Sequence, residues 1–285
     1  MPNLHRPLCH YRPMTVADVD NAHALSAAQG WAHRREEWAM LQRVAEGFVA
    51  EADGRLIGSA FACHQGGVST IGLVIVSQPY QGKGIGGQLM ERALHAVGQR
   101  TALLNATAAG APLYRKLGFQ AVGQVEQHQG HALVVGPTPL EPGKVCRALN
   151  AADAPPLLAL ANAASGMDRA AVFDDLRLAL QPGVGIEQGG QLQAFACLRP
   201  FGRGRCIGPV IAQHIDQAKH MIAHLLGTVP GAFVRIDVSA DHGLGGWLNG
   251  LGLEHVETVT RMAKGQLPRP AEGVQPFALI SQAIG

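Results

Sequence analysis

Residues 81–87 read Gln-Gly-Lys-Gly-Ile-Gly-Gly and lie between a run that predicts a strand and a run that predicts an amphipathic helix. Glycines let successive backbone N–H groups point into one concavity, and the dipole of the following helix favours an anion there. A phosphate group is therefore the expected ligand, and a turn that only connects the two elements is the plainer alternative. This segment constrains the fold most, because it requires a strand–loop–helix unit at one place in the chain.

Two other kinds of phosphate-binding loop are tested by the surrounding residues. Gly82-x-Gly84-x-x-Gly87 satisfies the dinucleotide fingerprint, but residues 101–107, where the acidic ribose ligand of that fold belongs, contain no Asp or Glu. The loop also follows several β-rich runs, whereas a dinucleotide-binding unit begins its parallel sheet with this strand. A Walker loop is excluded because Lys83 is followed by Gly84 in place of Ser or Thr.

The segments around the loop predict an α+β domain. Asp53-Gly54 and Gly66-Gly67 are hairpin signals between β-rich runs, so an antiparallel meander precedes the loop. Thr15 with Asp18 resembles a capping box at the start of the first helix. The expected order is a strand (9–14), helices (15–30, 34–45), strands (47–52, 55–64, 68–76), the loop, a helix to about 98, a strand (102–106), a helix (111–117) and a strand from 119.

The second half predicts the same order of elements again. Residues 137–143 hold three prolines and a glycine, which is typical of a linker. Beyond them we expect helices within 155–180, strands at 185–188, 191–199 and 205–211, a helix (216–226) and a strand (232–238). The segments 236–238 and 247–253 also echo 104–106 and 113–119. The predicted organisation is therefore two tandem domains, 1–136 and 144–265, with a linker at 137–143 and a C-terminal tail at 266–285.

Composition limits the partners. Hydrophobic residues make up 47% and charged residues 15%, with a net charge of +2 and no run of Lys or Arg, so nucleic acid is not expected. The five cysteines are scattered and form no CxxC pair, so neither a disulfide framework nor a metal site is expected. No apolar run reaches the roughly 18 residues of a membrane span. The sequence predicts a cytoplasmic protein that acts away from membranes.

Two linked motifs resemble those of the GNAT superfamily of N-acetyltransferases. Residues 74–86 resemble its acetyl-CoA motif after a strand, and residues 113–119, Leu-Tyr-Arg-Lys-Leu-Gly-Phe, resemble its second segment. The layout also resembles a two-domain subgroup called YitH-like. The resemblance implies two tandem GNAT-like domains, each a mainly antiparallel sheet flanked by helices, with the second degenerate. It also implies acetyl-CoA as the cofactor, held by Val74, Ile75, Val76, Gln81, Gly82, Lys83, Gly84, Ile85, Gly86, Gly87, Asn105 and Thr107.

The resemblance also implies catalytic roles. Tyr114 stands where these enzymes place a tyrosine near the coenzyme sulfur, and its phenol can donate a proton there; packing on the sheet is the alternative. The oxyanion is expected at the backbone near Val76. The strand over 68–76 carries no carboxylate, although many relatives use a glutamate there to activate the amine. The general base must come from elsewhere, and the candidates are Glu36, Glu37, His64 and Asp237.

The second half departs from the motif. Gly208-Pro209-Val210-Ile211-Ala212 takes the place of the glycine loop, and Pro209 lacks the N–H that a phosphate needs. Leu248 stands where Tyr114 stood. This half is therefore expected to bind no coenzyme and to form one wall of an acceptor pocket, with Trp31, Arg199 and Asp237 as the expected substrate residues.

Three hypotheses remain open on function. The first is an N-acetyltransferase that transfers the acetyl group to a primary amine of a small molecule by direct attack in a ternary complex. The second is a non-catalytic acyl-CoA sensor, which the missing strand carboxylate permits. The third is a protein or peptide N-acetyltransferase, which needs an open groove that a second domain over the site would narrow.

Overall fold

The computed structural model describes residues 9–285, and its first half follows the expected order of elements. The two hairpins of β2–β3–β4 turn at Asp53-Gly54 and Gly66-Gly67, as the turn residues predict. The elements are β1 (His10–Pro13), η1 (Val16–Asp18), α1 (Val19–Ala28), α2 (Arg35–Val44), β2 (Glu46–Ala52), β3 (Arg55–Gln65), β4 (Val68–Val76), η2 (Gln78–Tyr80), α3 (Ile85–Val97), β5 (Thr101–Ala106), α4 (Ala111–Lys116) and β6 (Gln120–His131).

The second half repeats this order from β1 to β6 with one added strand at its end. Its first strand was not expected from the sequence, because it is short and half exposed. The elements are β7 (Lys144–Ala148), η3 (Ala151–Asp153), α5 (Ala154–Ser165), α6 (Ala170–Leu176), η4 (Leu178–Leu180), β8 (Gly183–Gln188), β9 (Gln191–Phe201), β10 (Gly204–Ala212), α7 (Ile215–Gly227), β11 (Phe233–Ser239), η5 (Ala240–His242), α8 (Gly245–Gly250), β12 (Glu254–Lys264) and β13 (Gln275–Ala278).

The repeat extends to an ion-pair network at the start of each half. In β1, Arg12 forms two hydrogen bonds with Asp18, at 2.8 and 2.7 Å, and also pairs with Glu51 in β2. In β7, Arg147 forms the matching pair with Asp153, at 2.9 and 2.8 Å, and with Glu187 in β8, at 2.7 Å. Each aspartate also accepts a backbone N–H three residues before it, which completes a capping box. The same tertiary contact, six residues apart in each half, supports an internal duplication.

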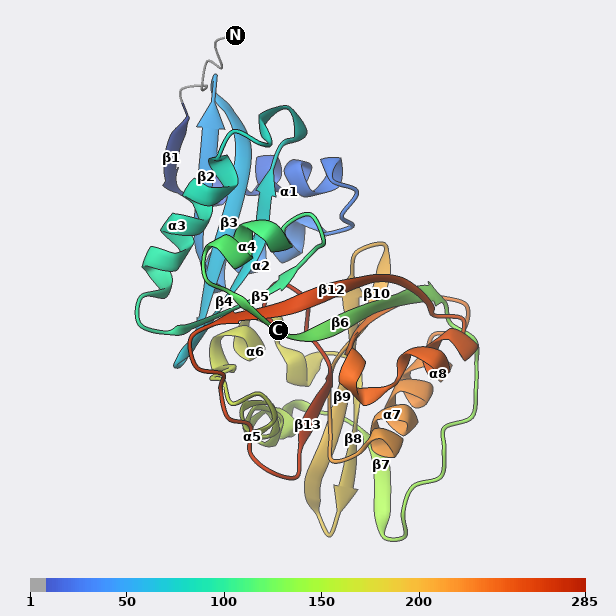
Figure 1. Cartoon of the computed structure of the whole chain (residues 1–285). Helices are drawn as coiled ribbons and strands as arrows, with labels where there is room; N and C mark the ends of the chain where they lie inside the picture. The colour runs from blue at the N-terminus through green and yellow to red at the C-terminus, as the bar shows by residue number, and fades with distance from the viewer. Residues whose placement is uncertain (1–8) are drawn as a thin grey trace.

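The two halves exchange their last strands within a 13-stranded sheet (Figure 1). β12 from the second half pairs antiparallel with β5, and β6 from the first half pairs antiparallel with β11. β6 and β12 also pair with each other, with Val125 opposite Val259. Each half of the sheet is therefore completed by a strand that belongs to the other half of the chain. The boundary at 137–143 stays a prediction; this segment holds no regular element.

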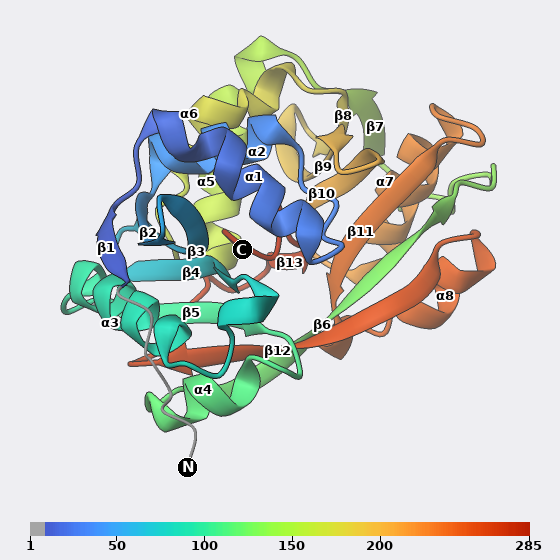
Figure 2. The same ribbon diagram turned by 90° about the horizontal axis from the view of Figure 1, so that it is seen from above.

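Helices cover both faces of the sheet. The inner layer consists of α1 and α2 from the first half and α5 and α6 from the second, seen together in Figure 2. Their apolar faces form one core that includes Trp38 and Phe195, and Arg43 in α2 pairs with Asp175 in α6 at 2.6 Å. The helices α3 and α7 pack on the outer faces over separate cores. The two halves therefore share one inner helical layer and one core.

The C-terminal tail, residues 266–285, lies inside the molecule. Its strand β13 inserts between β10 and β11, pairing antiparallel with both. Residues 277–281 and Ile284 are buried, and the side chain of Arg169 donates hydrogen bonds to the carbonyl groups of Ile284 and Gly285, at 2.8 and 2.5 Å. This apolar end of the chain thus fills the space between the two halves.

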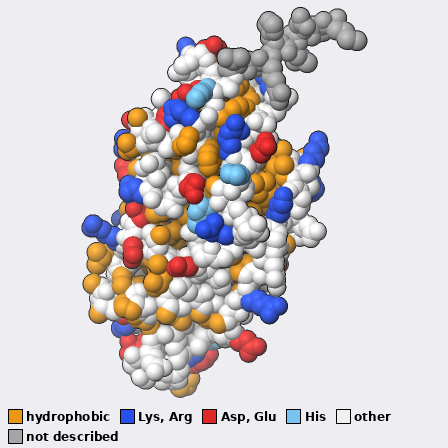
Figure 3. Space-filling view, turned by 90° about the vertical axis from the view of Figure 1, so that its left-hand side faces the viewer, with side chains coloured by type: hydrophobic (Ala, Val, Ile, Leu, Met, Phe, Trp, Pro, Cys, Tyr) orange, Lys and Arg blue, Asp and Glu red, His pale blue; other side chains and the backbone are white. Residues whose placement is uncertain are grey.

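On the face shown in Figure 3, basic and acidic side chains are interspersed among apolar ones. Among the helices of residues 9–285, none combines the length and the apolar character that a membrane span needs.

Candidate active site

The glycine loop connects η2 to α3. Gly82 and Gly84 have φ values of 74° and 83°, which side-chain-bearing residues rarely adopt. The first hydrogen bond of α3 runs from the N–H of Gln88 to the carbonyl of Gly84, at 3.2 Å. The amides of residues 85–87 therefore have no intrahelical acceptor. Because no heavy atom lies within 4 Å of a Cβ built at Gly82 or Gly87, the space beside these amides is open.

Next to the loop, β4 and β5 separate. They pair in parallel only from Val68 opposite Thr101 to Ile71 opposite Leu104. Leu73 then has a φ of 47°, a left-handed value that is strained for a non-glycine residue, and the pairing of β4 with β3 shifts register nearby. The backbone of β4 beyond Ile71 thus has no strand partner on the side of β5. A bound extended group can pair with this free edge.

A cleft of about 500 Å³ runs along this edge. One end lies at the glycine loop, and the other lies at the connection between α1 and α2. Its lining is backbone-rich and apolar, with few polar side chains. The lining residues are Gln29, Trp31, Ile71, Gly72, Leu73, Val74, Ile75, Val76, Tyr80, Gln81, Gly82, Gly84, Ile85, Gly86, Gly87, Leu104, Asn105, Thr107, Ala109, Gly110, Leu113 and Tyr114.

Tyr114 is one of the residues that line the cleft. It lies in α4, is 8% exposed, and packs edge-on against Phe119 with ring centroids 6.1 Å apart. Among residues 9–285 its hydroxyl has no hydrogen-bond partner. Burial raises the pKa of Tyr114 to about 12, since the charged phenolate is poorly solvated there. The phenol is thus protonated at neutral pH and free to donate a hydrogen bond into the cleft.

Asn105 and Thr107, at the end of β5, also line the cleft. The side-chain amide of Asn105 donates to the carbonyl of Gln282 in the tail, at 2.8 Å, while its Oδ1 atom is buried without a partner. Thr107 receives the backbone N–H groups of Gly110 and Ala111 on its carbonyl, at 3.1 and 3.0 Å, and so begins α4. An unpaired buried acceptor in a cleft is a site for a ligand donor.

Comparisons with known proteins agree with this geometry. Models of the acetyltransferase (GNAT) domain match residues 44–121 and 157–275. The uncharacterized N-acetyltransferase YitH of Bacillus subtilis (strain 168) is 30% identical over 223 residues, which cover 77% of this chain and 78% of that protein. The chain belongs to the GNAT superfamily of acetyltransferases. Two GNAT domains in tandem, of a mixed α+β fold, are thereby established.

Solved structures share the fold over nearly the whole chain. A putative acetyltransferase from Pyrococcus horikoshii has a TM-score of 0.77 at 19% identity and covers 100% of this chain and 99% of that chain. A tandem GNAT protein from the clavulanic acid biosynthesis pathway has a TM-score of 0.64 at 14% identity, covering 93% of this chain and 100% of that chain. The two-domain GNAT arrangement is therefore shared with other proteins.

The expected coenzyme residues converge on the cleft, with Lys83 as the exception. Lys83 lies beside the cleft with its Nζ atom 5.3 Å from the centroid of the Tyr80 ring. The side chain of Gln81 donates to the carbonyl of Val76, at 2.9 Å, and so ties the loop to β4. Sequence reasoning did not single out Tyr80, Leu113 or Gln29. The first two stand within or beside the recognised motifs, while Gln29 is placed only by the packing of α1.

The three expected substrate residues are not brought together. Trp31 lines the cleft at the end farthest from the glycine loop. Arg199 lies outside it, where its guanidinium donates to the carbonyl groups of Gly208 and Ile280. Asp237 is fully buried, forms hydrogen bonds with Arg235 at 2.9 to 3.2 Å, and accepts from the Gln282 amide at 3.2 Å. A role for Arg199 and Asp237 in acceptor recognition stays a prediction, and neither contacts the cleft.

The four candidate bases also lie outside the cleft. Glu37 is buried and accepts the backbone N–H of Arg34 at 2.5 Å, and burial raises the pKa of its carboxyl. Glu36 is exposed on the helix surface. His64, in β3, contacts Ser69 in β4 at 2.7 Å and Glu46 in β2 at 2.9 Å. None of these four residues lines the cleft, so a role for any of them as the general base stays a prediction.

In the second half, no glycine-rich loop follows the strand that matches β4. Residues 208–212 lie within β10, so the sequence assignment of this segment to the place of the glycine loop is wrong. β10 is as long as β4, with nine residues each, and the connection from β10 to α7 is only residues 213–214. β13 then occupies the gap between β10 and β11. Leu248, at the position of Tyr114, is fully buried.

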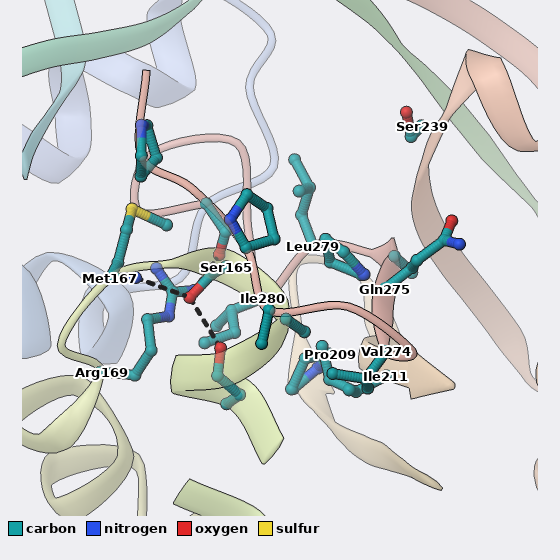
Figure 4. A pocket seen from close by; sticks show the side chains of 18 of the residues that line it. Ser165, Met167, Arg169, Pro209, Ile211, Ser239, Val274, Gln275, Leu279 and Ile280 are labelled. Atoms are coloured by element: carbon teal, nitrogen blue, oxygen red, sulfur yellow. Dashed lines mark hydrogen bonds between the residues drawn. The ribbon is translucent and has the colours of Figure 1, made fainter. Parts of the chain in front are cut away.

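A second cavity, of about 520 Å³, lies beside the tail (Figure 4). Ser165 marks one side, where its hydroxyl donates to the carbonyl of Ala161 at 2.7 Å and accepts the N–H of Met167 at 3.2 Å. Leu279 and Ile280 of the tail also line it. This cavity shares no lining residue with the cleft.

Proposed function

We propose that this GNAT enzyme transfers the acetyl group of acetyl-CoA to a primary amine of a small molecule, by direct attack in a ternary complex. The observation that carries the proposal is the single cleft that joins the glycine loop, the free edge of β4, Tyr114 and the loop bearing Trp31. The coenzyme phosphates need the glycine loop, the thioester needs the strand edge and Tyr114, and the acceptor needs the end of the cleft at Trp31. These features must follow one another in this order along one channel.

The residues present fit the coenzyme. The open space at Gly82 and Gly87 and the free amides at the start of α3 suit the pyrophosphate. The backbone of Val74 to Val76 offers a strand edge to the pantetheine arm, and the buried Oδ1 of Asn105 lacks a donor. When bound, acetyl-CoA supplies the activated thioester. The chain positions it through backbone groups, since few polar side chains line this part of the cleft.

Tyr114 is proposed to donate a hydrogen bond to the leaving sulfur. A phenol with a pKa near 12 is a weaker acid than a thiol with a pKa of about 8.5. Transfer of the phenol proton to the leaving thiolate is therefore unfavourable by itself. It becomes possible once the attacking amine has become positively charged, because the amine then has a proton to give up. Tyr114 then stabilises the developing thiolate and can pass on a proton that the product amine gives up.

The acceptor is proposed to enter as the neutral amine. Among the described residues that line the cleft, none is Asp, Glu, His, Lys or Cys, so no side chain there can serve as a general base. Deprotonation must occur in solution or through water. The fraction of neutral amine then limits the rate below the pKa of the amine itself.

The second half supports a small acceptor by holding the α1–α2 loop. The hairpin between β9 and β10 packs on it: the His33 and Phe201 rings meet edge-on at 5.9 Å, and the N–H of Gly202 reaches Glu37 at 3.3 Å. A Cβ at Gly202 would lie 2.9 Å from the carbonyl oxygen of Ala32. This close contact closes the acceptor end around Trp31, which favours a small molecule over a protein.

The test measures thiol release from acetyl-CoA with a panel of primary amines of different basicity, across pH. The expected result is turnover with some of these amines. The apparent pKa in kcat/KM should move with the pKa of each amine. Gly84→Glu, which places a charged side chain in the pyrophosphate space, is the control that should lose both binding and turnover.

Three outcomes would contradict the proposal in different ways. An apparent pKa that stays fixed across amines would show that the chain supplies a base. Tight binding of acetyl-CoA without turnover on any amine or peptide would favour the sensor hypothesis. Turnover on peptides alone would favour a protein acetyltransferase.

A further inference from the structure

Three metal-ligating side chains meet on the outer face of the second half, away from the cleft. Cys146 lies in β7, and His220 and His224 lie in α7. One ligand atom of each residue lies within 4.8 Å of the corresponding atoms of the other two. The two histidines are four residues apart, so they occupy the same face of the helix, and their rings stack at 6.5 Å. Helix α7 packs against β8, and β7 is the edge strand next to β8. The face of α7 with the two histidines therefore lies beside Cys146 in β7.

His220 is already oriented by a contact behind it. Its Nδ1 atom lies 2.5 Å from the carbonyl oxygen of Thr138, in the linker, and a carbonyl can only accept. Nδ1 therefore carries the hydrogen, and Nε2 is left with a free lone pair. A metal-binding histidine has this arrangement, in which the second ring nitrogen donates to a backbone carbonyl and fixes the ring.

The surroundings leave the three ligands available. His220 is 8% exposed, while Cys146 and His224 are half-buried, so an ion can enter from solvent. Among the described residues, neither Cys146 nor His224 forms a hydrogen bond or an ion pair. The cations on the same strand are both paired: Lys144 with Glu141 at 2.6 Å, and Arg147 with Asp153 and Glu187 at 2.8 and 2.7 Å.

We propose that Cys146, His220 and His224 form a zinc site with water as the fourth ligand. A thiolate and two imidazoles are ligands that zinc prefers, and three protein ligands leave a tetrahedral ion one open position. On binding, the thiol of Cys146 gives up its proton to solvent and the sulfur bonds to the ion.

The site has a structural consequence. It joins the edge strand β7 to α7, and through Thr138 it includes the linker 137–143. None of the three ligands lines the cleft, so the ion takes no part in acetyl transfer. Zinc should stabilise the second half and fix the path of the linker.

The test uses the full chain without an affinity tag, freed of metal by a chelator. Titration with Co²⁺ should give intense visible bands of a tetrahedral site and a near-ultraviolet thiolate-to-cobalt band, and one equivalent of Zn²⁺ should displace both. Cys146→Ser should remove the thiolate band, and both Cys146→Ser and His224→Ala should weaken zinc binding by more than about tenfold. Zinc should raise the Tm of the parent chain and not of these variants.

Matched controls separate this site from stray binding. Cys9→Ser removes a half-buried thiol, and His95→Ala removes an exposed histidine from the last turn of α3; neither residue belongs to the cluster. Both should bind like the parent chain. Absence of the thiolate band in the parent chain, or its survival in Cys146→Ser, would overturn the proposal. If Cys146→Ser fails to fold, unchanged zinc affinity in folded His224→Ala would overturn it as well.

Discussion

At the scale of single residues, the environment of Tyr114 fixes what it can do. Its ring is held by Phe119 and its hydroxyl opens to the cleft, so the residue contributes one hydrogen-bond donor at any pH below about 12. A phenol of this kind does not titrate in the range where enzymes are usually assayed. Any pH dependence below pH 10 therefore belongs to another group.

Tyr114→Phe should lower turnover and leave binding unchanged. The substitution removes the hydroxyl and keeps the ring, so the contact with Phe119 and the shape of the cleft persist. We expect kcat to fall by about 100-fold, the lower range for loss of an acid catalyst, with the same dissociation constant for acetyl-CoA. Steady-state kinetics and calorimetry measure the two. A loss under about threefold at every pH would exclude Tyr114 from the chemistry.

The repeated aspartates, Asp18 and Asp153, act on stability. The Arg12 hydrogen bonds, together with the Thr15 N–H, lower the pKa of Asp18 to about 2. A carboxyl whose pKa is lower in the folded state stabilises the fold above its unfolded pKa, near 3.8, and loses that contribution as pH falls towards 2. Arg147 lowers the pKa of Asp153 in the same direction.

Asp18→Asn should therefore destabilise the chain in a pH-dependent way. We expect a loss of about 1 to 2 kcal/mol in the free energy of unfolding at pH 7, because both the ion pair and the capping box are weakened. The difference from the parent chain should shrink as pH falls from 4 to 2. Urea unfolding at several pH values measures it. Asp20→Asn, on the exposed side of the same turn, should change little, and an equal loss there would contradict the assignment.

Sequence reasoning reached the residues that local motifs specify and missed those that tertiary packing brings in. The glycine loop and Tyr114 could be predicted because their spacing alone encodes the strand–loop–helix and the following turn. Cys146 and His220 could not be paired, because they lie far apart in the chain and meet only when β7 and α7 pack. The i, i+4 spacing of His220 and His224 was the available signal. Arg199 and Asp237 were singled out by their strand positions, without knowledge that carbonyl groups and Arg235 already occupy them.

At the scale of elements, the second half differs from the first by one strand and one loop. The first half keeps a gap between β4 and β5 and an eight-residue connection, 77–84, before α3. The second half fills the matching gap with β13 and connects β10 to α7 through residues 213–214. Its backbone donors on β10 are used by the tail, and no loop is present to hold a pyrophosphate.

The chain should therefore bind one acetyl-CoA. Calorimetric titration should give a stoichiometry of one, and Gly84→Glu should abolish all measurable binding. Gly243→Glu, at an open surface turn with positive φ in the second half, is the matched control and should bind as the parent does. A second equivalent bound by the parent, or residual stoichiometric binding in Gly84→Glu, would show that the second half retains a coenzyme site.

The order of elements could be predicted from the sequence, but their pairing could not. Periodicity and turn residues located the strands of both halves to within a few residues, β7, β12 and β13 excepted. β12 carries exposed residues along its first part, and its partners β5 and β6 come from the other half of the chain. Strand pairing at such distance depends on which sheet edge is free, and a local pattern does not hold that information.

At the scale of the whole molecule, the exchange of β6 and β12 makes each half depend on the other. The segment 144–265 by itself would lack β6, which pairs with β11 over seven residues. The segment 1–136 would lack β12, which pairs with β5. Each would leave a long sheet edge exposed, which promotes aggregation.

The two halves, expressed as residues 1–136 and 144–285, should fold well only together. We expect each fragment alone to be poorly soluble, and the mixture refolded together to give a stable complex with acetyl-CoA affinity close to that of the intact chain. Size-exclusion chromatography and calorimetry would measure this. A soluble, cooperatively folded fragment 144–285 that gains nothing from its partner would contradict the importance of the exchange.

The crossing strands also bear on how such a chain could arise. Two identical subunits that swap their last strands have a two-fold axis between them, and here the equivalent residues Val125 and Val259 face each other where that axis would pass. Leu279 packs against this pair, and Gln282 contacts both Asn105 and its counterpart Asp237. One tail can lie on an axis, whereas two related by symmetry would collide there. The tail is thus a feature that a symmetric ancestor could not have held in this place, and fusion of the two copies into one chain is what makes room for it.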